Sequence, residues 1–162
     1  MREPIKEPDL TQYMNIAIAE AKRGMRRGDG GPFGTVIVKD GKVIAKAHNM
    51  VLATKDPTMH AEIVAIRKAC KKTGSFDLSG CRLVSTCEPC PMCMAAIYWA
   101  KIRHVVFGCT RSDAAKINFA DREIYDVFDG AVQNPIKCVR RKRQACLCLF
   151  KDWAKMKEKT TY

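Results

Sequence analysis

The chain has 162 residues, enough for one domain with a single buried core, and its 47% hydrophobic and 28% charged residues are typical of a globular chain rather than a disordered one. No apolar run is long enough to cross a bilayer, and the N-terminus from Met1 to Pro8 lacks the apolar stretch of a signal peptide, so we expect a cytoplasmic protein with no membrane partner. The net charge of +12 favours anionic partners, and the odd number of nine cysteines favours reduced thiols over a disulfide framework.

The first half of the chain predicts a helix, a hairpin and a second helix. The first helix runs from Asp9 to Arg27, with Asp9 or Thr11 as its cap, and ends in the glycine-rich stretch 28–32. Residues 33–38 and 43–48 form two strands around Asp40-Gly41, which is a strong signal for a two-residue turn. Residues 50–58 form a loop, and the next helix carries His60 through Lys72 and ends near Gly74.

The second half alternates between strands and helices. A strand at 82–86 precedes a helix from Pro91 to about Ala100, and a further strand follows at 105–108. Residues 112–128 look helical but broken, 136–150 predict a last strand, and 149–157 predict a terminal helix. An antiparallel pair followed by crossover-connected strands predicts a three-layer α/β/α sandwich with a mixed five-stranded sheet, in one domain that spans 1–162.

Two short motifs carry the chemistry, namely His60-Ala-Glu62 and Pro89-Cys90-Pro-Met-Cys93. Each is weak alone, because short His/Glu and C-x-x-C patterns occur often by chance. Cys90 and Cys93 stand three residues apart at a predicted helix start, so their sulfurs face the same side, and the helix N-terminus favours thiolates. His60 stands at the start of the preceding helix, and in a sheet with crossover connections the two helix starts can converge at one edge.

Three ligands, His60, Cys90 and Cys93, would leave the fourth tetrahedral position of a zinc ion open for water, which is the arrangement of a catalytic site. Glu62 can face that water without binding the metal, and it can pass a proton to a leaving amine. The combination matches the H-x-E and P-C-x-x-C signature of zinc-dependent base deaminases. A structural zinc ribbon would need a second C-x-x-C, and a redox pair would leave His60 and Glu62 unexplained.

The chain resembles the cytidine-deaminase-like superfamily. Within it, the chain is most similar to bacterial guanine deaminases and plant guanosine deaminases. The stretches that carry the resemblance run from Gly30 to Gly41, from Asp56 to Glu62 and from Ser85 to Ala100. The match is good over residues 13–128 and looser elsewhere. It implies a cytidine-deaminase-like fold, one zinc ion per subunit and a homodimer, with a C-terminal tail that can be swapped between subunits.

The resemblance also implies roles for residues around the base. Phe33 and Trp99 would line the pocket, Asn49 would hydrogen-bond the base, and Asp121 would accept from the amino and ring N–H groups of guanine. Tyr162 would close the pocket of its own or a neighbouring subunit. Other interpretations remain open, because Trp99 could pack in the core or at an interface, Asn49 could cap a loop, and Asp121 could be a helix N-cap.

Hydrolysis of guanine to xanthine and ammonia is the activity that the resemblance favours. Guanosine, another nucleoside or a cytosine-type ring are alternative substrates. Transfer-RNA adenosine is a further alternative, because the run from Lys137 to Arg143 has five basic residues in seven and could bind phosphates. That run has no interleaved aromatic residues, however, which argues against nucleic acid. A zinc-binding partner subunit without turnover is the non-enzymatic alternative, and the presence of Glu62 argues against it.

Overall fold

A mixed sheet of four strands, in the order β2-β1-β3-β4, forms the centre of the computed structural model, which describes residues 10–161. β1 (Gly34–Lys39) pairs antiparallel with β2 (Lys42–His48) and with β3 (Arg82–Cys87), and β3 pairs parallel with β4 (His104–Cys109). The β1–β2 turn uses Asp40 and Gly41 at φ 48° and 73°, values that a two-residue hairpin of this kind requires. The predicted hairpin and the mixed sheet are therefore confirmed.

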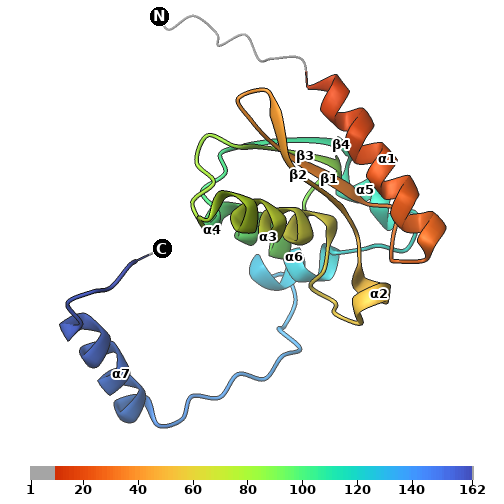
Figure 1. Ribbon diagram of the computed structural model, residues 1–162. Helices are drawn as coiled ribbons and strands as arrows, with labels where there is room; N and C mark the ends of the chain where they lie inside the picture. Colours follow the sequence, from red (N-terminus) through yellow and green to blue (C-terminus); the bar gives the residue numbers. More distant parts are fainter. Residues whose placement is uncertain (1–9, 162) are drawn as a thin grey trace, which may run out of the picture.

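Helices cover both faces of this sheet (Figure 1). α1 (Thr11–Arg27) packs on one face, while α3 (Ala61–Thr73) and α4 (Pro91–Trp99) pack on the other. Alternation along β1 explains the two cores, because Val36 joins the α1 side and Ile37 joins the side of α3 and α4. The three layers expected from the sequence are present, and the starts of α3 and α4 lie together on one side of the sheet.

The ends of the first helices differ in part from the prediction. The N-cap of α1 is Leu10, with no side-chain cap bond, so Thr11 does not cap the helix, and Asp9 lies outside the described residues. The helix ends at Gly28, whose φ of 70° favours glycine. The predicted loop 50–58 contains one short helix, α2 (Val51–Thr54).

The prediction of a fifth strand in 136–150 is wrong. After α5 (Arg111–Ala115) and α6 (Arg122–Phe128), the chain runs without regular structure to α7 (Arg143–Lys155). The spacing of the apolar residues explains why this segment is a helix. Cys146, Leu149, Phe150 and Trp153 recur at intervals of three and four residues, whereas a half-buried strand needs apolar and polar residues in alternation. Figure 1 shows α7 well away from the α/β body, at the end of an extended connection. Among residues 10–161 no helix combines the length and the apolar composition needed to cross a membrane.

Candidate active site

Two helix starts bring three possible metal ligands together. His60 is the N-cap of α3, Cys90 is the N-cap of α4, and Cys93 lies in the first turn of α4. The Nδ1 atom of His60 lies 3.6 Å from the sulfur of Cys90 and 3.5 Å from that of Cys93. One ligand atom from each of the three residues lies within 4.8 Å of the other two. The convergence expected from the sequence is therefore present.

These distances fit a zinc ion. Zinc binds imidazole nitrogen at about 2.0–2.1 Å and thiolate sulfur at about 2.3 Å, so tetrahedral angles place the two atoms about 3.6 Å apart. Both nitrogen–sulfur separations agree with that value. The donor set of one imidazole and two thiols is also the set that zinc prefers, and it leaves one tetrahedral position for a non-protein ligand. His60, Cys90 and Cys93 are thus placed to bind zinc.

The two thiols are strongly coupled without the metal. Contact with Cys93, and then with His60, lowers the pKa of Cys90 to about 4. The Cys90 sulfur in turn raises the pKa of Cys93, because the pair shares a proton and Cys93 is buried. The Cys90 sulfur, which accepts a hydrogen bond from the His60 ring N–H, raises the pKa of His60. Zinc binding requires both thiolates and a neutral imidazole, so loading the site releases protons.

Glu62 is buried directly behind these ligands. It lies in the first turn of α3 and is 5% exposed. The hydroxyl of Ser85 donates to Oε1 at 3.0 Å, and the Cys93 thiol donates to Oε2 at 3.5 Å. Burial raises the pKa of Glu62 and outweighs the hydrogen bond from Ser85. A carboxyl group in this setting is suited to taking up and giving back a proton.

A cavity of about 590 Å³ is lined by His60, Cys90 and Glu62, while Cys93 is buried beneath its surface. Phe33, Asn49 and Asp121, for which the family resemblance implies contact with the base, all line it. The ring of Phe33 meets Phe119 edge to face, with centroids 5.0 Å apart and planes at 88°. The cavity therefore combines flat apolar surfaces with a few polar groups, as small-molecule sites do.

Two of the predicted pocket residues are not placed in this cavity. Trp99 ends α4 with 60% of its surface exposed and is not among the described residues that line the cavity. Tyr162 lies outside the described residues. The roles that the resemblance implies for both remain predictions.

Sequence reasoning missed several polar residues of the site. Ser85 is fully buried beside Glu62, and nothing in its sequence context marks it except its place in a predicted strand. Glu88 and Arg111 line the cavity, and Oε2 of Glu88 accepts the main-chain N–H of Arg111 at 3.0 Å. The guanidinium of Arg111 stacks on Tyr125, 4.4 Å from the ring centroid. The position of Glu88 directly before the Pro89–Cys93 motif was the one available signal.

Asp121 occupies the N-cap position of α6, which was the alternative interpretation of this residue. Its side chain nevertheless makes no cap hydrogen bond. Burial raises the pKa of Asp121, and the carboxyl group lines the cavity. Helix capping therefore does not explain why an aspartate stands at this position, and the carboxyl group of Asp121 is available to a ligand.

Comparison with known proteins agrees with this geometry. The family model for the cytidine and deoxycytidylate deaminase zinc-binding region matches residues 8–109. Guanine deaminase of Bacillus subtilis is 42% identical over 151 residues, which cover 93% of this chain and 97% of the relative. A tRNA-specific adenosine deaminase of Aquifex aeolicus is 45% identical, but over 59% of this chain and 63% of its own length. The X-ray structure of guanine deaminase from Bacillus subtilis superposes with a TM-score of 0.87 and 40% identity, covering 96% of this chain and 99% of that one.

Proposed function

The chain belongs to the cytidine and deoxycytidylate deaminase family, and from that membership we propose that it is a zinc-dependent guanine deaminase. The reaction is hydrolysis of a C–N bond in a cyclic amidine, which converts guanine and water to xanthine and ammonia. One observation carries the proposal, namely that Glu62 and two of the three residues placed to bind zinc, His60 and Cys90, line a cavity that Asn49 and Asp121 also line. The full-length similarity to a guanine deaminase favours this base over other amidines.

The bound zinc ion supplies Lewis-acid activation of water near neutral pH. Glu62 takes a proton from the attacking water and delivers it to the neighbouring ring nitrogen. It then takes the remaining proton from the added hydroxyl group and delivers it to the amino group, which leaves as ammonia. Its Oε1 atom is held by Ser85, and the Cys93 thiol that donates to Oε2 becomes a thiolate when it binds zinc. Oε2 then loses that donor, so it is the oxygen that moves the proton. His60, Cys90 and Cys93 hold the metal while the carboxylate works beside it.

The cavity wall suits the hydrogen-bonding edge of guanine. The ring N–H and the amino group lie side by side and both donate, and the carboxylate of Asp121 accepts from such a pair. The Oδ1 atom of Asn49 already accepts the Val51 N–H at 3.1 Å, so its amide nitrogen is the end that donates to a ring nitrogen or carbonyl. The edge-to-face pair of Phe33 and Phe119 offers apolar surface to the ring.

A substrate panel tests the proposal. Zinc-loaded protein is incubated with guanine, guanosine, cytosine, adenosine and a tRNA anticodon stem–loop, and ammonia is measured. We expect release from guanine above all others. Release from the stem–loop alone would identify a tRNA adenosine deaminase, and retained zinc without turnover of any substrate would identify a binding subunit; either result overturns the proposal.

We further propose that the active form is a homodimer in which the C-terminal tail, residues 131–162, packs on a second copy. Leu149, Phe150 and Trp153 of α7 are 67%, 71% and 43% exposed, so this apolar face is largely uncovered among the residues that the structure describes. Tyr98 and Trp99 expose a second apolar area on α4. Short helices are stable in water when an amphipathic face is packed, so a second copy accounts for both areas. In such a dimer, Trp99 and Tyr162 can reach the base pocket of one of the two copies.

We also propose a cytoplasmic location, because all nine cysteines are free.

A further inference from the structure

A cluster of ionisable side chains, three of which are buried, lies behind the cavity wall and outside the zinc site. His48, at the end of β2, is 4% exposed, and its Nε2 atom lies 2.9 Å from Oδ2 of Asp29. Its Nδ1 atom lies 3.4 Å from Oε2 of Glu20, a residue of α1 that is itself 4% exposed. Arg23 and Lys46 reach Glu20 at 2.6 Å and 3.3 Å, and Arg27 reaches Asp29 at 3.1 Å. Buried charges are tolerated only when they are paired in this way.

The cluster is joined by main-chain bonds to the wall of the cavity. The carbonyl oxygen of Asp29 accepts the N–H groups of Leu52 and Ala53 in α2, at 3.1 Å and 3.0 Å. His48 immediately precedes Asn49, whose own N–H donates to the carbonyl of Phe33 at 3.0 Å. Asn49 and Leu52 both line the cavity. Movement of His48 or Asp29 would therefore move the residues that face the base.

Two glycines show how closely other segments of the same chain pack against this wall of the cavity. A Cβ atom on Gly24 of α1 would lie 2.5 Å from Cδ2 of His48, and a Cβ atom on Gly30 would lie 2.1 Å from Oδ1 of Asn49. Real Cβ atoms do not approach other atoms so closely, so a Cβ atom at either position would have to displace His48 or Asn49. The imidazole and the Asn49 amide are thus fixed by packing as well as by hydrogen bonds.

We propose that His48, held between Glu20 and Asp29, is a positioning residue that fixes Asn49 and the start of α2 for base binding. It touches neither the base nor the metal, and it acts through Asn49 and through the Asp29 carbonyl. The inference rests on the proposed function insofar as Asn49 binds the base. The zinc chemistry does not use this cluster of ionisable side chains, and the positioning role explains its place behind the cavity wall.

Steady-state kinetics with guanine test the proposal. His48→Gln retains one donor and His48→Phe retains none, so we expect KM to rise about threefold and about tenfold respectively, with kcat within about threefold of wild type and zinc content unchanged. In the Asn49→Ala background, His48→Gln should raise KM little further, because both changes remove the same contact. Full additivity in this cycle, or an unchanged KM in His48→Phe, would overturn the proposal.

A matched control separates positioning from general stability. Tyr13→Phe removes the hydrogen bond from the Tyr13 hydroxyl to the Gly41 carbonyl, 2.8 Å long, on the same helix but away from the cavity. It should lower the melting temperature and leave KM unchanged. If the His48 variants fail to fold, Gly24→Ala takes their place. Alanine favours the helix, while its methyl group displaces the imidazole ring of His48. We expect KM to rise about tenfold, as in His48→Phe. A normal KM in Gly24→Ala contradicts the proposal.

Hydrogen exchange gives a readout that does not depend on the substrate. The amides of Leu52 and Ala53 should exchange at least tenfold faster in His48→Gln than in wild type, and at the wild-type rate in Tyr13→Phe. If wild type turns over no guanine, the proposed function fails while this exchange result still supports the positioning role. Unchanged exchange at both amides overturns the positioning role even if guanine is the substrate.

Discussion

The hydroxyl of Ser85 donates to Oε1 of Glu62 at 3.0 Å, and this bond joins strand β3 to the first turn of α3. Thr35 on the adjacent strand lies 3.2 Å from the same hydroxyl, so the donor is itself held in place. The arrangement fixes one carboxylate oxygen and leaves the other beside Cys93 for proton transfer. The sheet therefore orients the proton carrier as well as supporting the helix.

Ser85→Ala should lower kcat about tenfold, because the carboxylate loses the bond that orients it, while KM and zinc content stay near wild type. Ser79→Ala, in an exposed turn, is the control for loss of a hydroxyl. The measurement is initial-rate kinetics with guanine together with metal analysis. A full loss of zinc in Ser85→Ala would show that the serine supports the metal site instead.

Glu62→Gln should lower kcat by about 10²- to 10⁴-fold, because an amide cannot carry the proton. Zinc content should be unchanged, since Glu62 is not among the three residues placed to bind the metal. Glu88→Gln provides a matched control, because it neutralises a second carboxylate that lines the same cavity. Equal losses in the two variants would mean that the charge of the cavity, and not proton transfer by Glu62, is responsible.

Removal of zinc with a chelator should abolish turnover, and the addition of one equivalent of zinc should restore it. Cys90→Ser should bind zinc more weakly, because a serine hydroxyl is a poorer zinc ligand than a thiolate. Metal analysis and ammonia release, measured on the same samples, check both expectations. Cys70→Ser is the control for loss of a thiol, since Cys70 lies at the far end of α3 from His60. Turnover by a metal-free sample would contradict the zinc mechanism.

The zinc ligands were predictable because their spacing and their helix starts are local properties of the sequence. His60 and Cys90 are both N-caps. The connections between the strands are short, so the starts of α3 and α4 have to lie close together. Ser85 and the pairing of His48 with Glu20 and Asp29 were not predictable, since they depend on which residues face each other across the layers. The false fifth strand has a different cause, because the apolar residues of 143–155 follow helical spacing, which the prediction for 136–150 did not take into account.

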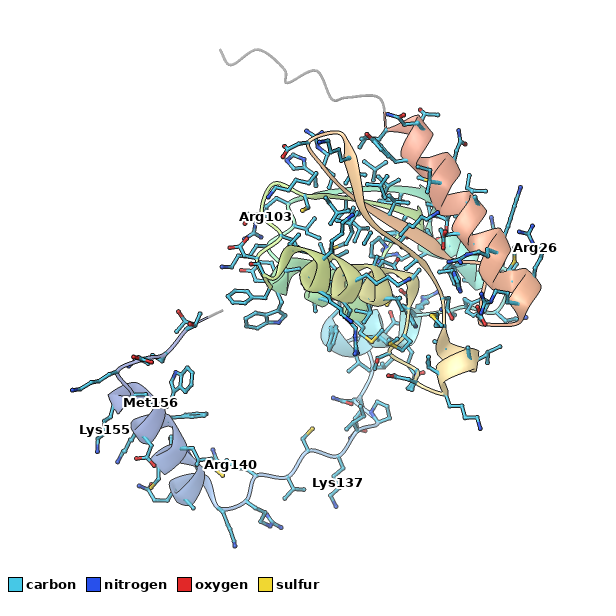
Figure 2. All side chains as sticks on the ribbon, in the orientation of Figure 1. Arg26, Arg103, Lys137, Arg140, Lys155 and Met156 are labelled. Atoms are coloured by element: carbon cyan, nitrogen blue, oxygen red, sulfur yellow. The ribbon has the colours of Figure 1, made fainter. Side chains whose placement is uncertain are left out.

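Phe150→Asp should convert the proposed homodimer to monomer, because it places a charge on the apolar face of α7, where Phe150 is 71% exposed in the single chain. Gln144→Asp introduces the same charge on the opposite side of this helix, away from Leu149, Phe150 and Trp153, and should leave the dimer intact. Light scattering after size exclusion measures both. Figure 2 shows Lys137, Arg140 and Lys155 along this tail, so the assay is run at two salt concentrations to separate apolar packing from charge. A wild-type monomer at every concentration would rule out the proposed dimer.

The acid stability of the protein should depend on Glu20. Burial alone raises the pKa of this carboxyl group, but the hydrogen bonds from Arg23, Lys46 and His48 outweigh burial and lower it below the ordinary value of 4.5. A carboxyl group whose pKa is lower in the folded state stabilises the fold above its unfolded pKa, and that stabilisation is lost as the pH falls through the folded pKa. Glu20→Gln should therefore lower the free energy of unfolding by about 1–3 kcal/mol at pH 7, because it weakens buried pairs. The difference from wild type should shrink below about pH 4.5.

Urea unfolding at pH 7, 5 and 4 measures this change in the free energy of unfolding. Asp152→Asn in the exposed tail is the control, and it should show no such trend. A wild-type advantage that grows towards low pH would mean that the carboxyl is held in its neutral form and that the ion pairs with Arg23 and Lys46 do not decide its charge.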